Sequence, residues 1–377
     1  MSELMTVAEN RANTRWQLLT GVCALALLGS SAIAEAQHED TERPVVWVEL
    51  GADLQRVVTG QKNYSPDFLN VQPRPTFEVI SPSQTQRLPR YSVGGEASLT
   101  FTPKQSDWSI LAGVKFGRSN GDKHVHQQTT DHPQRGYYFG EPFYANLVRW
   151  GDTKVAHKQS DLLLDFQVGK DIGFGAHGSG NSTFALGIRF AQFTSKSSVR
   201  LRERPDGYYM MVKTAVGVKY RPLESHHTYL AQFGSERSFR GFGPSISWTG
   251  SAPVAGDSED HELTFDWGVN AAVLFGRQKA SGTFHTTDQF FPKAYLLLNP
   301  LVAVTRQGDG FDRSRAKVVP NLGGFAGLSF RYDTAKVSFG YRADFFLGAM
   351  DGGIETRKTY DRSFYGPFAK VSIGLGG

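Results

Sequence analysis

The chain has 377 residues, of which 40% are hydrophobic, 20% charged and 12% aromatic, with 41 glycines and a net charge of +5. A low content of charge with much glycine and many aromatic side chains suits an all-β protein with many turns. The lysines and arginines are scattered, and no basic run is long enough to indicate a nucleic-acid-binding arm. We therefore expect no nucleic-acid partner.

The N-terminal segment has the organisation of a secretory signal peptide. Two arginines precede an apolar run at 18–28 that is too short to span a bilayer. Small residues follow, and the pattern Ala-Ile-Ala predicts cleavage after Ala34, with a second possible site after Ala36. We expect a signal peptide at 1–34 and one mature domain at 35–377; a buried N-terminal helix is the alternative.

The cysteine content and the hydropathy of the remaining chain agree with export. The only cysteine, Cys23, lies inside the apolar run, so the mature protein is expected to hold no disulfide and no thiolate metal site. After residue 37 there is no stretch of about 18 apolar residues. The sequence thus predicts an exported protein without a membrane-spanning helix.

The stretch LTFDWGVNAAVLFG (Leu263–Gly276) alternates with a period of two residues. One face carries Leu263, Phe265, Trp267, Val269, Ala271, Val273 and Phe275. The opposite face carries mostly small or polar residues, including Asp266 and Asn270. Such a stretch predicts a β-strand with one apolar face and one face that tolerates an aspartate. The same pattern recurs at 91–102, 108–116, 162–170, 184–190, 208–220 and 336–347.

Aromatic residues often stand near both ends of the apolar faces, as Tyr91 and Phe101 do. A barrel with lipid outside and water inside needs an apolar band between two aromatic girdles. Closure into a barrel also leaves no unpaired strand edge in hydrocarbon. We therefore predict an all-β transmembrane antiparallel β-barrel of about 12 strands, with a range of 10–14, in the outer membrane of a Gram-negative bacterium.

The expected strands and connections alternate regularly along the chain. The strands are expected near 45–58, 91–102, 108–117, 161–171, 183–194, 208–220, 228–235, 238–249, 261–276, 321–332, 337–348 and 364–375. Long connections are expected at 59–90, 118–160, 195–207, 277–320 and 349–363, and they alternate with short ones, as external loops alternate with periplasmic turns. The segment 277–320 is expected to be either a loop that constricts the barrel mouth or a loop with an extra strand.

The C-terminal third resembles a known family. The stretches that carry the resemblance are SFRGFGPSISW (Ser238–Trp248), AAVLFG ending at Gly276, GLSFRYDTAKVSFGYRADFFLGA (Gly327–Ala349) and SFYGPFAKVSIGL (Ser363–Leu375). Together they resemble the Legionella-type pore-forming major outer membrane protein family over roughly residues 238–375. This resemblance implies an outer-membrane barrel with porin-like activity.

The sequence favours neither a metal site nor a hydrolase. The segment KHVHQQTTDH brings together His124, His126, Asp131 and His132. Imidazole and carboxylate suit zinc or copper, but the spacing matches no metal motif, and a solvated loop is the preferred interpretation. No serine pairs recognisably with His226, His227 or His261. We therefore expect no catalytic residues, no metal and no cofactor.

Charged and polar residues on the small-residue faces are the best functional candidates. The predicted lumen-facing residues are Glu96, Lys115, Asp165, Arg189, Lys213, Asp266, Asn270, Arg331, Arg342 and Asp344. Their mixed signs would set a transverse field that selects solutes, or they would pair across the lumen and stabilise the wall. The two interpretations stay open at this point.

The leading functional hypothesis is a porin-like pore for passive diffusion of small hydrophilic solutes. Its expected partners are outer-membrane lipid, lipopolysaccharide, the solutes and the barrel assembly machinery. One alternative is a barrel that only anchors surface loops that bind host or matrix components. A barrel lipid hydrolase is the least favoured alternative.

Overall fold

The computed structural model describes residues 45–59, 91–104, 106–130, 134–138, 141–145, 148–173, 181–204, 208–212, 221–257, 261–292, 302–353 and 358–376. The expected cleavage sites after Ala34 and Ala36 lie outside these residues, and so do Asp131, His132 and Lys213. Within the described ranges, no helix is long and apolar enough to cross a membrane.

Ten antiparallel strands form a closed barrel. In ring order they are β10 (His261–Pro292), β11 (Val302–Tyr332), β12 (Ala335–Asp351), β13 (Thr359–Leu375), β1 (Val46–Thr59), β2 (Tyr91–Phe101), β3 (Trp108–Thr130), β6 (Val148–Asp171), β7 (Asn181–Arg204) and β9 (Arg221–Asp257). Pairing of β9 with β10 closes the ring. The predicted antiparallel β-barrel is confirmed, and ten strands fall within the expected range.

Three short strands lie outside the ring. The strands β4 (Gln134–Tyr138) and β5 (Glu141–Ala145) pair with each other as a separate two-stranded sheet. The strand β8 (Tyr208–Val212) pairs with the beginning of β9. None of the three contributes to the barrel wall.

Both ends of the described chain lie at one end of the barrel. Val46 pairs with Leu375 on one side and with Phe101 on the other. The two-residue turn between β11 and β12 lies at this same end, where Asp333 has a φ of 52°, a left-handed conformation that aspartate tolerates better than most residues. We call this the short-turn end.

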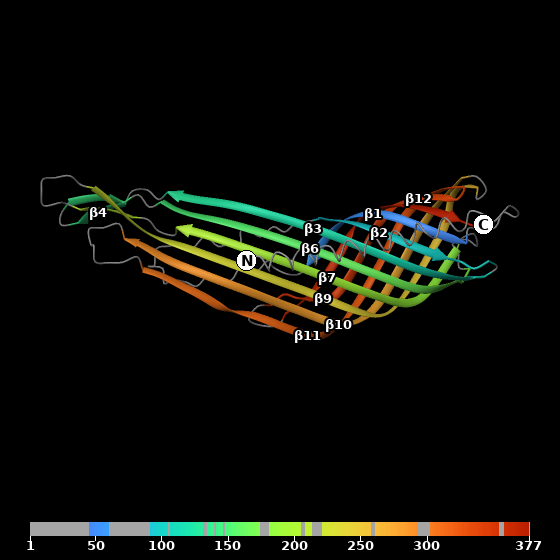
Figure 1. Ribbon diagram of the computed structural model, residues 1–377. Helices are drawn as coiled ribbons and strands as arrows, with labels where there is room; N and C mark the ends of the chain where they lie inside the picture. The colour runs from blue at the N-terminus through green and yellow to red at the C-terminus, as the bar shows by residue number, and fades with distance from the viewer. Residues whose placement is uncertain are drawn as a thin grey trace, which may run out of the picture.

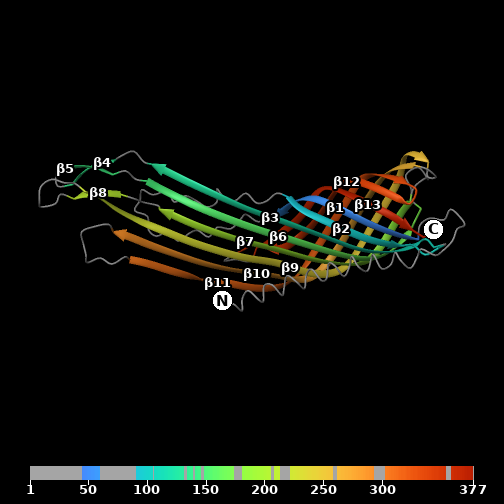
Figure 2. The same ribbon diagram turned by 45° about the horizontal axis from the view of Figure 1, so that its top comes forward.

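At the other end, six neighbouring strands continue well past the rim of the barrel. Figures 1 and 2 show β3, β6, β7, β9, β10 and β11 running out together as a curved sheet, whereas β12, β13, β1 and β2 stop near the rim. The contrast is visible in length, since β10 has 32 residues and β12 has 17. We call the projecting part the extension, made of residues 119–130, 148–159, 195–204, 221–237, 280–292 and 302–313.

The extension corrects several expected boundaries. The expected loops 118–160, 195–207 and 277–320 are largely strand, with hydrogen-bonded pairs such as Lys154 with Arg200 continuing outward. At the rim, the outward face changes from apolar to charged side chains, which in sequence resembles the end of a strand. The backbone pairing nevertheless continues, because antiparallel hydrogen bonds do not depend on which face is apolar.

The same finding concerns two segments whose strand boundaries were ambiguous in sequence. The strands expected at 228–235 and 238–249 are one strand, β9, which also contains residues 221–227. Of the segment 277–320, residues 293–301, which hold most of its apolar run, lie outside the described residues. Its described parts, up to 292 and from 302, pair with each other as the outer portions of β10 and β11.

The outward surface of the barrel carries a broad apolar belt. On β6, for example, Leu164, Phe166 and Val168 are exposed, and the flanking outward residues are Lys158 and Lys170. Period-two alternation on every strand places these side chains outside and the intervening ones inside the ring. The interior of the barrel is therefore lined by the residues that alternate with those of the apolar belt.

Candidate functional site: the barrel interior

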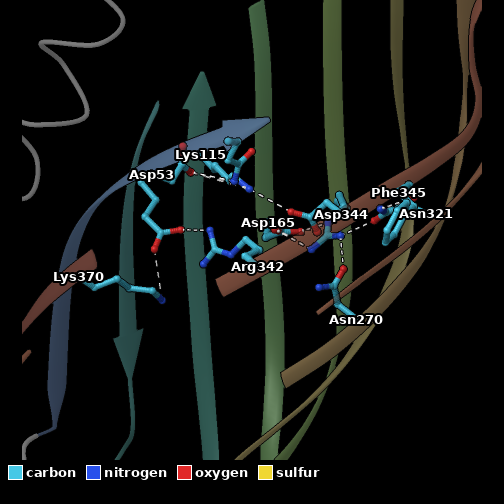
Figure 3. A network of polar contacts seen from close by, with 12 residues as sticks. Asp53, Lys115, Asp165, Asn270, Asn321, Arg342, Asp344, Phe345 and Lys370 are labelled. Carbon is cyan, nitrogen blue, oxygen red and sulfur yellow. Dashed lines mark hydrogen bonds and ion pairs between the residues drawn. The ribbon is translucent and has the colours of Figure 1, made fainter. Parts of the chain in front are cut away.

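A lysine between two aspartates lies at the centre of the interior. Lys115 of β3 has its Nζ 3.0 Å from Oδ2 of Asp344 on β12 and 4.0 Å from Oδ2 of Asp53 on β1. All three side chains are nearly buried. Because β3 and β12 are four strands apart in the ring, the Lys115–Asp344 pair spans the lumen (Figure 3).

A second group of ion pairs lies beside the first. Arg342 of β12 donates a hydrogen bond to Glu96 of β2. Lys370 of β13 has its Nζ 3.4 Å from Glu96 Oε1 and 3.5 Å from Glu49 Oε2. The glutamate Glu96 therefore receives one arginine and one lysine from strands that are not its neighbours.

Arg189 of β7 uses its guanidinium in two directions. Its Nε and Nη2 donate to the two carboxylate oxygens of Asp165, at 2.6 and 3.1 Å. Its Nη1 donates to Oδ1 of Asn270 at 2.6 Å and also to Oδ1 of Asn321. A planar guanidinium suits this fork geometry, so one arginine holds β6, β10 and β11 in fixed relation.

Asp266, the acid in the middle of an apolar strand, is fully accommodated by polar partners. Its Oδ2 lies 2.5 Å from Lys336 Nζ and accepts a hydrogen bond from Ser329 Oγ at 2.5 Å. Its Oδ1 accepts from Ser251 at 2.6 Å and from Thr264 at 3.0 Å. An inward carboxylate with four partners explains why the strand tolerates it.

The structure brings together most of the residues proposed from sequence for the lumen. Eight of them take part in the contacts described above: Glu96, Lys115, Asp165, Arg189, Asp266, Asn270, Arg342 and Asp344. Arg331 lies apart, near the short-turn end, with its guanidinium 5.7 Å from the ring centroid of Trp47. Of the two interpretations left open, these contacts are those of side chains that pair across the lumen.

A cluster of four phenylalanines lies above this charged layer, toward the extension. It consists of Phe193 of β7, Phe239 of β9, Phe346 of β12 and Phe364 of β13, each at most 1% exposed. The ring centroid of Phe193 lies 4.7 Å from that of Phe346, 5.6 Å from that of Phe364 and 6.1 Å from that of Phe239. We call this cluster the aromatic plug.

The plug joins opposite walls of the barrel. The strands β7 and β13 are five places apart in a ring of ten, so Phe193 and Phe364 approach each other across the full lumen. Sequence reasoning missed the plug although a signal was present. Its phenylalanines stand on the inward phase of their strands, where small or polar residues were expected.

A buried polar layer lies directly above the plug. It contains His157 and Asp161 of β6, Ser195 of β7, Arg237 of β9 and Arg362 of β13, each at most 6% exposed. The guanidinium of Arg362 lies 5.1 Å from the ring centroid of Phe364. Burial, followed by the positive charges of Arg362 and Arg237, lowers the pKa of His157 to about 4.

This layer contains a serine–histidine contact that was not foreseen from sequence. Ser195 Oγ lies 3.4 Å from Nε2 of His157, and Gln159 Nε2 lies 2.5 Å from the same nitrogen. None of the residues that the structure describes forms a hydrogen bond with Nδ1 of His157. A histidine that serves as a general base is normally oriented by an acid at its other nitrogen, and no described carboxylate takes that place beside His157.

The histidines considered from sequence lie elsewhere. His261 packs against Tyr332 with ring centroids 4.9 Å apart, and the side chains of His226 and His227 lie outside the described residues. His124 and His126 lie on the outward face of the extension, both beside Asp152. Among the residues that the structure describes, no group of three or more His, Cys, Asp and Glu side chains is placed to hold a metal ion.

Comparison with known proteins gives remote structural similarity alone. No protein-family model matches the chain, and no curated protein matches it. Similar solved structures include the transport unit of the autotransporter AIDA-I from Escherichia coli (7% identity, 91% of this chain and 94% of that chain, TM-score 0.23).

Others are the toluene transporter TodX of P. putida (10%, 88% and 90%, 0.17) and OmpT, an outer membrane protein of Vibrio cholerae (10%, 87% and 99%, 0.13). No property of this chain is inferred from similarities with such low TM-scores. The assignment of the fold as a closed barrel follows from the pairing of its strands.

Proposed function

We propose that this chain is an integral outer-membrane β-barrel that is closed at rest and presents its extension outside the cell as a binding surface. The observation that carries the proposal is the aromatic plug, because Phe193 and Phe364 meet from opposite walls. A barrel whose interior is filled by its own side chains serves as an anchor, and the sheet beyond the rim then becomes the part available to partners.

Placement in a membrane is supported by the outward surface. A barrel strand crosses hydrocarbon with about 9–11 residues, and on β6 the segment between Lys158 and Lys170 has 11. The outward side chains in this segment are mostly apolar, whereas lysine stands at both margins. In outer-membrane barrels the short turns are periplasmic, so the extension points away from the cell.

The charged layer below the plug also supports a closed state. The described lysines and arginines of this layer are within ion-pair or hydrogen-bond distance of carboxylates, as Lys115 is of Asp344. A buried charge whose partner is removed is costly. A solute that crosses the lumen would have to separate these ion pairs. The layer therefore stabilises the barrel wall and does not form a path for solutes.

Conductance in planar bilayers tests this proposal. We expect the refolded wild-type protein to show little steady conductance, and the double variant Phe193→Ala/Phe364→Ala to show larger and more frequent openings. The matched control is Phe242→Ala/Phe275→Ala, a cross-strand pair on the exposed belt, which should conduct as the wild type does. Steady wild-type conductance that the plug variant leaves unchanged would contradict a closed barrel.

A second candidate is the porin-like channel for small hydrophilic solutes. Two features favour it: the presence of both charge signs in the lower lumen, and the sequence resemblance of residues 238–375 to a pore-forming family of Gram-negative outer membranes. Under this hypothesis the plug moves aside during conduction. The same bilayer experiment distinguishes the two candidates, because a channel conducts before any phenylalanine is removed.

A further inference from the structure

We infer that the outer rim of the long-strand side binds phosphate groups of a phosphorylated glycolipid in the outer leaflet. The inference rests on the proposed placement in the outer membrane and adds to it a binding site with named residues. Its basis is a set of like-charged residues that face each other across neighbouring strands on the outward surface.

The pair nearest the belt consists of Arg240 on β9 and Arg277 on β10. The two residues are directly opposite each other in the strand register, and both side chains are exposed. Like charges in this arrangement destabilise a sheet. Within the described part of the chain, neither arginine has an ion pair with a carboxylate, so an external anion would relieve their repulsion.

A second pair continues the positive rim on the adjacent strands. Lys158 on β6 lies directly opposite Lys196 on β7, and both are exposed. Glu236 on β9 lies 2.8 Å from Lys196 Nζ and neutralises one of the two charges. Lys279 adds a further exposed positive charge two residues beyond Arg277 on the same face of β10. The rim therefore keeps an excess of positive charge across four strands.

The position of the arginines identifies the anion as part of a lipid. Two residues closer to the barrel centre on the same faces stand Phe242 and Phe275, which are 65% and 53% exposed and belong to the apolar belt. The guanidinium groups thus lie where hydrocarbon gives way to headgroups. Arginine binds phosphate with two parallel hydrogen bonds, and basic residues at a membrane surface attract anionic headgroups. Because the neighbouring side chains are apolar, the molecule that carries such a phosphate should also carry acyl chains.

Binding of purified lipid A to the refolded full chain in detergent tests the inference. We expect tighter binding of diphosphorylated lipid A than of chemically dephosphorylated lipid A, measured by quenching of tryptophan fluorescence. The variant Arg240→Ser/Arg277→Ser should lose about twenty-five-fold in affinity for the phosphorylated lipid, because each basic residue contributes about fivefold. Arg277→Lys, which keeps the charge and loses the fork, should show a smaller loss.

The control is Lys104→Ser/Lys170→Ser, which removes two exposed charges at the short-turn end and should keep wild-type affinity. If the arginine variant does not fold, Lys158→Ser/Lys196→Ser replaces it, with an expected loss of about fivefold because Glu236 already neutralises one of these two charges. The inference would be overturned by equal affinity for both lipids or by unchanged binding in the rim variants. It would also be overturned if inorganic phosphate displaced the lipid at a concentration equal to that of the lipid. A wild-type chain that fails to insert into vesicles would instead contradict the membrane placement itself.

Discussion

The barrel and the extension are built from the same strands, yet their polarity is opposite. On β6 within the barrel, Leu164 faces outward and Asp165 faces inward. In the extension of the same strand, Lys154 and Lys158 face outward and Val155 is buried on the inner face. The strand keeps its alternation throughout, and what changes is the kind of side chain that each face carries.

This inversion shows that the surroundings of each face, and not the strand itself, select the residue types. On β10 the outward residues change from Val273 and Phe275 to Arg277 and Lys279 within four positions. Hydrocarbon favours the first pair and water the second. Under the proposed placement in the outer membrane, the point of inversion marks where the membrane ends on the long-strand side.

The largest expected effect concerns charge on the inner side of the barrel. Asp344→Asn should destabilise the folded protein by about 3–5 kcal/mol, because the buried Lys115 loses its nearer carboxylate partner and keeps only Asp53, at 4.0 Å, among the described residues. Asp312→Asn, on the exposed face of the extension, should change stability by less than about 0.5 kcal/mol. Urea unfolding in lipid vesicles measures both, and similar losses would remove the distinction between the two regions.

The next effect concerns charge on the outward face. Val269→Arg in the belt, where the residue is 51% exposed, should cost about 2–4 kcal/mol, because arginine then faces the bilayer interior. Thr283→Arg, outward on the same strand but in the extension, should fold as the wild type does. The folded fraction on a heat-modifiability gel reports the outcome, and equal yields would place lipid on neither segment.

A third effect concerns the polar layer between the two regions. The pKa of His157 falls from 6.5 to about 4 in the folded protein, so the unfolded chain binds its proton more readily. Stability from this group is fully present above pH 6.5 and is lost as the pH falls toward 4, by about 3 kcal/mol in total.

The matched variant is His157→Gln, which should lack this loss. Burial raises the pKa of Glu203 to about 7, so this carboxyl favours the folded state on acidification and partly masks the histidine in the wild type. Because Glu203 is present in both proteins, the difference between their pH–stability curves isolates His157. Parallel curves would show that the histidine titrates normally.

The smallest effect concerns an ion pair on the extension. Lys196 and Glu236 lie 2.8 Å apart with both side chains at least half exposed, so a double-mutant cycle with alanine should give about 0.2–1 kcal/mol at low salt and less at high salt. A coupling energy as large as that of Lys115 with Asp344 would indicate that the outward face of the extension is covered by another molecule.

Sequence was sufficient to recognise the ten wall strands because alternation is a local property, although the same alternation wrongly predicted a wall strand at 208–220, where the described residues 208–212 form β8 outside the ring. Each strand through the belt could be recognised from its own residues, such as the period-two pattern at 263–276. The lumen partners could not be recognised in the same way. Lys115 and Asp344 are separated by 229 residues, and only the closure of the ring determines that they meet.

The extension and the plug were missed for different physical reasons. The extension begins where the outward side chains change from apolar to polar. A prediction that follows outward apolar residues ends the strand at that point, and for this reason 118–160 was expected to be a loop. The plug requires knowledge of which phenylalanines share a level in the barrel. Phe193 and Phe364 reach the same level through the register of strands far apart in sequence, and strand register is not encoded in any single segment.

The seam between β1 and β13 has a consequence for the order of assembly. Ser372 and Lys370 contact Glu49 across this seam, the serine over a separation of 323 residues. Until β13 is added, β1 therefore presents an open edge and Glu49 and Glu96 lack their shared lysine. Because non-local pairing must overcome a large loss of chain entropy before it is stabilised, wall closure and completion of the internal ion pairs coincide in one late kinetic step. An intermediate arrested before that step would carry an unpaired edge able to join another chain.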